Sequence, residues 1–179
     1  MRLLLLGGPK FLGRAVIDAA LERGHEVTQF NRGTTGADLY PDVPRILGDR
    51  DGGLEGLRGG EWDAVVDTSG YLPRLVGASA ELLKDAVGHY VFVSSISVYA
   101  SFAEVVDEQA PVAELSEPGS EDIGKDYGAL KALCEQSVES AFPGRATAVR
   151  AGLIVGPHDP TTPSASTGSS ARRSRSVAR

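Results

Sequence analysis

The feature that most constrains this fold is a glycine-rich turn between the first two elements that the sequence predicts. The apolar run at residues 2–6 predicts a β-strand, and apolar residues at helical spacing in residues 11–23 predict a helix. Between them lies the sequence GGPKFLG at residues 7–13. Such a turn lets the backbone and the helix N-terminus, with its free N–H groups and positive dipole end, approach a pyrophosphate. The start of the chain therefore predicts a Rossmann-type βα unit that binds a dinucleotide.

The rest of the chain alternates short apolar runs with helical patterns, which is typical of βαβ units around a parallel sheet. Further strands are expected at residues 26–30, 45–47, 64–67, 89–94 and 147–150. Helical segments are expected at residues 54–57, 73–87 and 127–141, and Gly24 is placed to end the first helix. This order predicts the α/β class, with a Rossmann-type, doubly wound parallel sheet and helices on both faces.

The distribution of charge divides the chain into a domain and a tail. The 179 residues carry a formal net charge of −6, but residues 161–179 hold four arginines and no acid, which leaves residues 1–160 at −10. The tail is rich in Ser and Thr and cannot bury enough apolar surface to offset the cost of ordering it. We therefore expect an NAD(P)-binding domain at residues 1–160 and a disordered tail at residues 161–179. Nucleic acid is not an expected partner, because surfaces that bind it need a basic excess.

Cysteine usage and hydropathy favour a cytoplasmic protein. Cys134 is the single cysteine, so the chain cannot form an intrachain disulfide or a cysteine-based metal cluster. The three histidines lack the spacing of metal ligands, and no metal is expected. The apolar run before Gly7 is too short for a signal peptide, and no segment approaches the roughly 20 apolar residues of a membrane span.

The choice between NAD and NADP depends on residues after the second and third predicted strands. An acidic residue after the second strand binds the 2′-hydroxyl of NAD, whereas a cationic residue accommodates the 2′-phosphate of NADP. Asn31 and Arg32 occupy this place, so NADP is the preferred cofactor and NAD the alternative. Lys10 and Arg14 add nearby positive charge, and the alternative is that Arg32 and Arg14 are solvated surface groups. Asp49, after the third strand, could accept a hydrogen bond from the adenine amino group or cap the following turn.

Three side chains are candidates for acid–base chemistry. Tyr127 and Lys131 lie four residues apart and therefore on one face of the predicted helix. An ammonium group beside a tyrosine stabilises the phenolate and makes the hydroxyl a candidate general acid or base. Ser95 follows the fifth predicted strand, at the edge where doubly wound folds bind ligands, and could hydrogen-bond the substrate oxygen. As alternatives, a Tyr–Lys pair occurs by chance on surface helices, and Ser95 could cap a turn.

Seven motifs in sequence order give the chain a family resemblance. They are GGPKFLG, FNRG, GDRD, DTSGYLP, FVSSISVY, YGALK and RAGLIVGPHDP. With them, residues 1–160 resemble the extended and atypical short-chain dehydrogenase/reductase superfamily, specifically its NAD-dependent epimerase/dehydratase branch. The resemblance implies hydride transfer at a carbinol or carbonyl carbon of a small-molecule substrate that the sequence does not identify.

The resemblance also assigns roles to single residues. Gly7 and Gly13 match the outer glycines of the family's GxxGxxG turn, and Ser95 matches its active-site hydroxyl. Tyr127 and Lys131 match the YxxxK pair, whose lysine also binds the nicotinamide ribose. The expected catalytic residues are Ser95, Tyr127 and Lys131. The expected cofactor-binding residues are Gly7, Gly8, Lys10, Phe11, Leu12, Gly13, Asn31, Arg32, Asp49, Thr68 and Lys131.

Three departures from the family pattern bear on function. Lys10 stands at the middle glycine of the turn, and Ala151 stands where the family has an Arg-Pro pair. After residues 156–160 the family continues into elements that form the substrate pocket, whereas this chain continues into its Ser, Thr and Arg-rich tail. We therefore expect a truncated product, from a frameshift or a shortened gene, in which catalysis can be absent.

Two classes of function follow. The leading one is an NAD(P)-dependent oxidoreductase or epimerase, for which the resemblance implies a homodimer paired through the helix that bears YxxxK. The alternative is a non-catalytic nucleotide sensor or an RNA-associated protein, because some relatives bind RNA on the same fold and the tail is basic. The charge of −10 on residues 1–160 and the complete Ser, Tyr and Lys set favour the enzyme.

Overall fold

Six parallel strands form one sheet, in which all but one pair of neighbouring strands are consecutive along the chain. The computed structural model describes residues 1–159. The strands are β1 (Arg2–Leu6), β2 (Glu26–Asn31), β3 (Arg45–Leu47), β4 (Trp62–Asp67), β5 (Val87–Ser95) and β6 (Ala146–Ala151). Their order across the sheet is β3-β2-β1-β4-β5-β6. The chain winds outward in two directions from the boundary between β1 and β4, which confirms the predicted doubly wound, Rossmann-type sheet.

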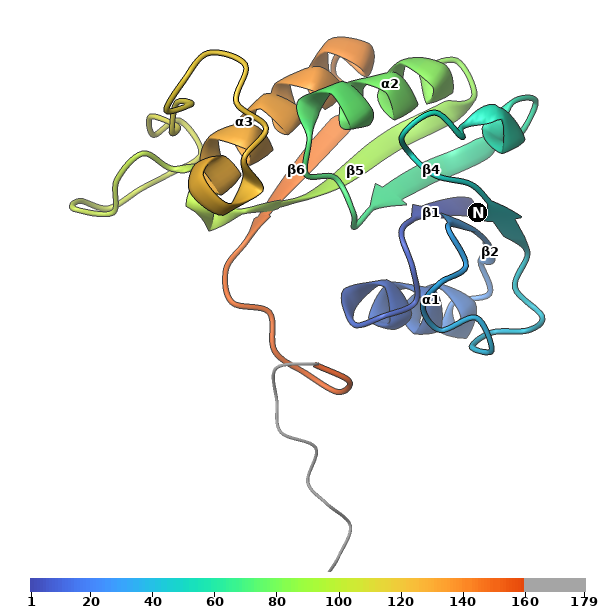
Figure 1. Ribbon diagram of the computed structural model, residues 1–179. Coiled ribbons are helices and arrows are strands. Elements are labelled where there is room, and N and C mark those ends of the chain that lie inside the picture. The colour runs from blue at the N-terminus through green and yellow to red at the C-terminus, as the bar shows by residue number, and fades with distance from the viewer. Residues whose placement is uncertain (160–179) are drawn as a thin grey trace, which may run out of the picture.

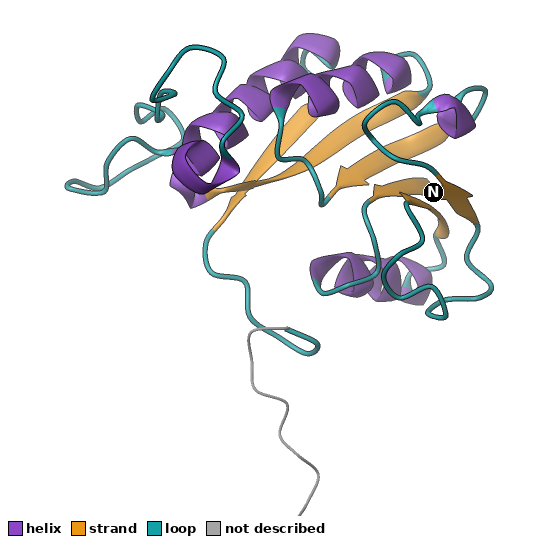
Figure 2. Cartoon of the chain, in the orientation of Figure 1, coloured by secondary structure: helices purple, strands orange, loops and turns teal. Residues whose placement is uncertain are grey.

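Helices cover both faces of this sheet (Figure 1). On one face lies α1 (Leu12–Glu22), and on the other α2 (Pro73–Leu83) and α3 (Ile123–Ala141) pack side by side. Two short 3₁₀ helices, η1 (Glu55–Leu57) and η2 (Ile96–Val98), follow β3 and β5. Figure 2 shows the resulting three layers, with the strands between the helices.

The side chains of β1 explain why the sheet is covered on both sides. Successive residues of a strand point to opposite faces. Leu4 and Leu6 join the core under α2 and α3, whereas Leu5 joins the core under α1 beside Ile17. Full burial of each leucine stabilises the fold by about 1.5–3 kcal/mol. A strand that is apolar on both faces is therefore favourable only inside a sheet with helices on both sides.

The main differences from the predicted boundaries lie at the end of α2 and at the starts of β4 and α3. The helix expected to reach Val87 ends at Leu83, because Val87 begins β5 and pairs with Trp62 of β4. The strand expected at residues 64–67 starts two residues earlier, so Trp62 is the buried first residue of β4. The helix expected to start at Tyr127 starts one turn earlier, because the carboxylate of Asp122 accepts hydrogen bonds from two backbone N–H groups of its first turn.

The strand β6 forms one edge of the sheet. It pairs with β5 on one side, and no other strand within residues 1–159 pairs with its second side. Its side chains are less buried than those of the inner strands, and Val149 is 43% exposed. The sheet is thus open at this end in the described part of the chain.

Several sequence expectations concern features beyond the sheet. None of the helices in residues 1–159 is long and apolar enough to cross a membrane. In the same residues, no group of three or more His, Cys, Asp or Glu side chains is placed to hold a metal ion. The predicted tail lies outside the described residues, so the boundary at residue 160 stays a prediction.

Phe142 tests how far stability depends on the core under α2 and α3. Its ring is fully buried and meets Tyr90 edge to face, with ring centroids 5.1 Å apart. We expect Phe142→Ala to lower the free energy of unfolding by about 3–5 kcal/mol, because a cavity forms and an aromatic contact is lost. Phe102→Ala is the control, since Phe102 is 56% exposed and its removal should cost less than about 1 kcal/mol. Equal losses in denaturant titrations of the two variants would contradict this assignment of the core.

Candidate functional site

Two adjoining pockets lie along the edge where the parallel strands end. The β2 pocket is formed by residues that follow β1, β2 and β3 and by one side of α2. The β5 pocket is formed by the start of α1, the end of β5 and the middle of α3. Gly8, Arg32, Ser69 and Tyr71 contribute to the walls of both. The pockets are therefore two halves of one groove, suited to an elongated ligand with two different ends.

Every candidate site residue from the sequence lines one of these pockets, because the parallel strands bring distant segments to one edge. The β2 pocket includes Gly7, Gly8, Asn31, Arg32 and Asp49. The β5 pocket includes Gly8, Lys10, Phe11, Leu12, Gly13, Arg32, Thr68, Ser95, Tyr127 and Lys131. All of these residues thus lie along one groove, and their roles in binding and catalysis are proposals.

Backbone geometry explains the glycines of the turn. Gly7 has a φ of +132°, a backbone conformation that residues with a side chain rarely adopt. A Cβ at this position would also overlap the hydroxyl of Thr68. A Cβ at Gly13 would overlap the carbonyl of Gly8, so α1 packs directly against the turn. A Cβ at Gly8 would meet only the carbonyl oxygen of Thr35, at 3.9 Å. Packing within the protein therefore does not require glycine at Gly8, and the space above it faces both pockets.

The space above Gly8 and the start of α1 fit the phosphates of a dinucleotide. No side chain caps the N-terminus of α1, and such a terminus favours an anion through its N–H groups and dipole. Lys10 does not disturb this arrangement, because its side chain is exposed and its φ is not positive. The departure from the family's middle glycine is therefore compatible with the turn.

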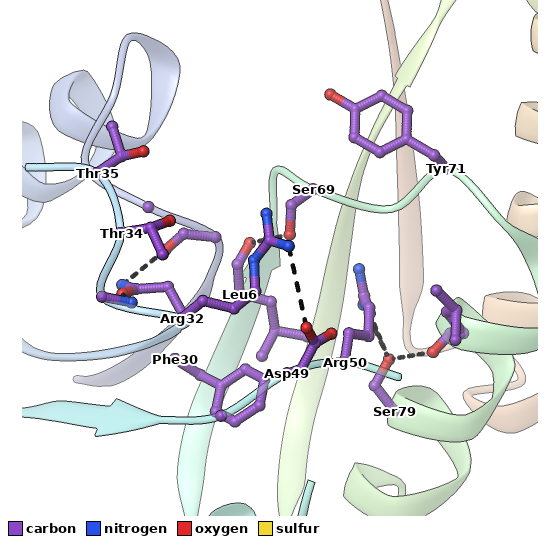
Figure 3. A pocket seen from close by; sticks show the side chains of 16 residues that line it. Leu6, Phe30, Arg32, Thr34, Thr35, Asp49, Arg50, Ser69, Tyr71 and Ser79 are labelled. Carbon is purple, nitrogen blue, oxygen red and sulfur yellow. Dashed lines mark hydrogen bonds and ion pairs between the residues drawn. The ribbon is translucent and has the colours of Figure 1, made fainter. Parts of the chain in front are cut away.

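Two residues at the end of β2 have different environments, and Figure 3 shows the second of them, Arg32, beside Asp49. The amide of Asn31 donates to the Gly7 carbonyl at 3.3 Å, and its oxygen accepts from the N–H of Gly33 at 2.9 Å. Asn31 therefore ties the turn to the loop after β2. Arg32 is exposed, and its guanidinium lies 3.9 Å from the carboxylate of Asp49. Asp49 also accepts a hydrogen bond from the N–H two residues later, so its turn-capping role is observed while its adenine contact stays a prediction.

The β5 pocket brings Ser95, Tyr127 and Lys131 together from two elements. Ser95 ends β5, whereas Tyr127 and Lys131 lie on one face of α3. The Ser95 hydroxyl accepts a hydrogen bond from the N–H of Ser97 at 3.1 Å, so it also caps η2. The half-buried ring of Tyr127 lies beside that of Tyr71, with centroids 6.5 Å apart. The three polar side chains share the walls of one pocket, as acid–base chemistry requires.

The ammonium group of Lys131 is held firmly in the interior. Lys131 is 3% exposed and donates to the carbonyl oxygens of Gly70 at 2.8 Å and Val93 at 2.7 Å. Its nitrogen also lies 3.9 Å from the centre of the Phe92 ring, a cation–π contact. Burial lowers the pKa of Lys131 to about 8, while the carboxylate of Asp67 acts in the opposite direction. Lys131 is therefore charged at neutral pH by only a small margin.

Gly128 allows α3 to approach the turn after β5. A Cβ at this position would overlap the carbonyl of Ser97. The backbone of α3 thus contacts η2 directly, next to Tyr127 on the helix and to Ser95 before η2. The sequence reasoning missed Gly128, although its place directly after Tyr127 in YGALK was a usable signal.

A second missed feature is a buried ion pair beneath the β2 pocket. Arg50 donates to both carboxylate oxygens of Asp67, one of them at 3.0 Å, and to the hydroxyl of Ser79 at 3.0 Å. The hydroxyl of Tyr90 donates to the same carboxylate at 2.7 Å. Burial alone would raise the pKa of Asp67, but the attraction of Arg50 and these hydrogen bonds outweigh it and hold that pKa below its usual value. The two residues belong to the GDRD and DTSGYLP motifs, and nothing in either motif pairs them.

A curated relative of this chain is a reductase. The 2-alkyl-3-oxoalkanoate reductase of Stenotrophomonas maltophilia is 30% identical over 183 aligned positions, which cover 89% of this chain and 52% of the relative. The chain therefore spans about half the length of the curated relative it matches. No family model matches the chain.

Solved structures with this fold include sugar-nucleotide epimerases. The UDP-glucuronic acid 4-epimerase of Bacillus cereus, in complex with NAD, matches 89% of this chain and 59% of its own with a TM-score of 0.70 and 17% identity. The Bordetella bronchiseptica enzyme WbmG, in complex with NAD, matches 84% of this chain and 52% of its own with a TM-score of 0.67 and 20% identity. A UDP-galactose 4-epimerase matches 84% and 55%, with a TM-score of 0.65 and 23% identity. At the level of the fold, the resemblance stated from the motifs is confirmed.

The contact at Gly128 yields a test of how the site is assembled. We expect Gly128→Ala to lower the free energy of unfolding by about 1–3 kcal/mol, because the added methyl group overlaps the Ser97 carbonyl and forces α3 outward. Gly77→Ala, in α2, is the matched control. The nearest atom to its added Cβ would be 3.7 Å away, so helix propensity should make this change neutral or stabilising by up to about 1 kcal/mol. Thermal and denaturant unfolding would measure both, and a neutral Gly128→Ala would contradict the close contact.

The buried ammonium of Lys131 should make stability depend on pH. Its pKa in the folded chain is about 8, below the ordinary value of 10.5. Between these values the unfolded chain binds more protons, so the free energy of unfolding should rise with pH by at most about 1.4 kcal/mol per unit. Burial raises the pKa of Cys134 from 9 to about 12, so above pH 9 this thiol lowers the free energy of unfolding and opposes the effect of Lys131. The effect of Lys131 is therefore measured best between pH 8 and 9.

Denaturant titrations across this window compare the wild-type chain with Lys131→Met. The variant has no ammonium to deprotonate, so its free energy of unfolding should stay flat between pH 8 and 9. The same upward slope in both proteins would show that Lys131 is not the group responsible.

Proposed function

We propose that this chain is the nucleotide-binding part of an NAD(P)-dependent oxidoreductase or epimerase of the extended short-chain dehydrogenase/reductase superfamily. The observation that carries the proposal is that Ser95, Tyr127 and Lys131 line the same pocket as the glycine-rich turn. The fold shared with NAD-bound enzymes, one of them a UDP-glucuronic acid 4-epimerase, and the 30% identity to a reductase support it. A protein that only sensed a nucleotide would need the turn but not the three polar side chains, and no observation in residues 1–159 favours an RNA-associated role.

Each polar side chain has a distinct part in the proposed reaction. A bound nicotinamide dinucleotide supplies or accepts the hydride. The hydroxyl of Tyr127 transfers the proton to or from the substrate oxygen, and Ser95 hydrogen-bonds that oxygen and orients it. Lys131, anchored on two backbone carbonyls, stabilises the tyrosinate through its charge and binds the nicotinamide ribose.

We infer that the chain prefers NADP over NAD. Arg32 is exposed at the end of β2, and its pairing with Asp49 is long and solvent-accessible, so it contributes little. A 2′-phosphate carries more negative charge than a carboxylate and could replace Asp49 beside Arg32. Arg50 is not available for this purpose, because Asp67 and Ser79 occupy its donors. Solved neighbours contain NAD, so the choice between the cofactors depends on side chains at this place rather than on the fold.

The proposed substrate is a small molecule that contains a carbinol or carbonyl carbon. The relatives' names indicate two classes, a 3-oxoalkanoate and UDP-sugars, and the chain spans only about half of each relative. We therefore assign neither class. A cytoplasmic location, consistent with the single thiol of Cys134, and a homodimer paired through α3 are further parts of the proposal.

Calorimetric titration with NADPH and NADH tests the cofactor site. We expect micromolar or tighter binding of NADPH by the wild-type chain and weaker binding of NADH. Gly8→Val should weaken both by about tenfold or more, because its side chain would enter the space proposed for the phosphates, where the protein itself leaves room. An unchanged melting temperature would show that the variant still folds.

A second variant separates the two cofactors. Arg32→Gln should weaken NADPH by about tenfold and leave NADH within about twofold, because only NADPH has a phosphate to pair with the guanidinium. A wild-type chain that binds neither cofactor would refute the proposal. Equal losses for both cofactors in Arg32→Gln would retain the site but remove the argument for NADP.

A further inference from the structure

Two buried cations and one buried carboxylate lie beneath the groove. The side chain of Arg50 is 12% exposed and that of Asp67 is fully buried. Lys131 is 3% exposed and forms no ion pair with any residue in the range 1–159. Glu135, the carboxylate nearest to it along α3, is instead paired with Arg150 at 2.8 Å. Asp67 is therefore the one buried carboxylate among these three groups, and the two cations belong to different halves of the groove.

The segment after β4 connects these groups. The carbonyl of Gly70 accepts a hydrogen bond from Lys131 at 2.8 Å. A Cβ at Gly70 would lie 3.2 Å from Oδ2 of Asp67 and 2.5 Å from the ring of Phe92. The same ring lies 3.9 Å from the ammonium of Lys131. Asp67 and Lys131 thus both lie close to Gly70, and Phe92, whose ring contacts Lys131, is the partner of Asp67 in the pairing of β4 with β5.

We propose that Asp67 is a positioning residue for both halves of the site: it fixes Arg50 beneath the β2 pocket and keeps Lys131 charged in the β5 pocket. The inference rests on the proposed function in one respect, which is that Lys131 uses its charge in catalysis. The charge itself is a property of the folded chain without a ligand, so it can be measured separately.

Asp67 is suited to this role because it stays ionised. Arg50 binds both of its oxygens, the Tyr90 hydroxyl donates at 2.7 Å, and the N–H of Ser69 donates at 3.1 Å. Each of these interactions favours the carboxylate over the neutral acid. Because the protein interior is less polarisable than water, the electrostatic attraction between Asp67 and Lys131 is only weakly screened.

The other charged and titratable groups around Lys131 come from four segments of the chain. Arg50, after β3, repels the ammonium, while Asp67 at the end of β4 attracts it. On α3, Cys134 and Glu135 act in the same direction as Asp67 but rank below it. The ring of Tyr71, in the loop after β4, lies 5.7 Å from the ammonium. Arg50 and Asp67 therefore exert opposing effects on Lys131, and removal of one should shift its titration opposite to removal of the other.

The titration of Lys131 in the ligand-free chain measures this directly. The chain has four lysines, so ¹³C labelling at lysine Cε gives few NMR signals, and Lys131→Met identifies the relevant one. We expect a wild-type midpoint near pH 8. Asp67→Asn should lower the midpoint by about one unit, and Arg50→Gln should raise it by about half a unit or more.

Two further variants keep the test decisive. Tyr90→Phe removes one hydrogen bond to Asp67 without changing any charge, so it should shift the midpoint less than Asp67→Asn does. If Asp67→Asn fails to fold, the double variant Asp67→Asn/Arg50→Gln leaves no unpaired charge, and its midpoint should lie below that of Arg50→Gln alone. Circular dichroism would establish folding in each case. Shifts in the same direction for Asp67→Asn and Arg50→Gln, or no shift in either, would overturn the inference.

Calorimetry on the same variants distinguishes this inference from the proposed function. If the wild-type chain binds no NAD(P) but the midpoints shift oppositely, the charge role of Asp67 stands and the proposed function fails. If the cofactor binds but the midpoints do not move, the proposed function stands and the role of Asp67 is wrong.

Discussion

The parallel pairing of β1 with both β2 and β4 is the constraint on which the site depends. It brings the ends of three strands together, and the backbone then locks them. The N–H of Gly7 donates to the carbonyl of Phe30 at 3.0 Å. The carbonyl of Leu6 accepts from the N–H of Thr68 at 3.0 Å and from the hydroxyls of Thr68 and Ser69, each at 3.2 Å. The glycine-rich turn therefore has a fixed position relative to the loops on either side of it, before any ligand is considered.

The parts of this arrangement that the sequence predicted are local in the chain. A strand, a glycine-rich turn and a helix follow one another within the first 23 residues, and the spacing of Tyr127 and Lys131 falls within one helical turn. Ser95 was found because its motif ends a buried strand. These patterns need no knowledge of which elements are neighbours in space, and they led to every candidate residue that lines the groove.

The missed features all depend on contacts between elements. Arg50 and Asp67 follow different strands, and their pairing depends on how the loop after β3 folds over the end of β4. Gly128 has meaning only because the turn after β5 lies against α3. Val87 looks like the end of an amphipathic helix until its pairing with Trp62 makes it a strand residue. In each case the tertiary partner, rather than local propensity, decided the outcome.

The open side of β6 has a consequence for the behaviour of this chain in solution. In the described residues, the outward-facing N–H and C=O groups of its six residues have no neighbouring strand, and Val149 adds exposed apolar surface beside them. Such an edge is a template for another β-strand, from the same chain or from a second molecule. The guanidinium of Arg150, the one charge on this strand, is directed toward Glu135 of α3 and so does little to discourage such pairing. A strand added at this edge in solution would therefore both extend the sheet and satisfy the open N–H and C=O groups of β6.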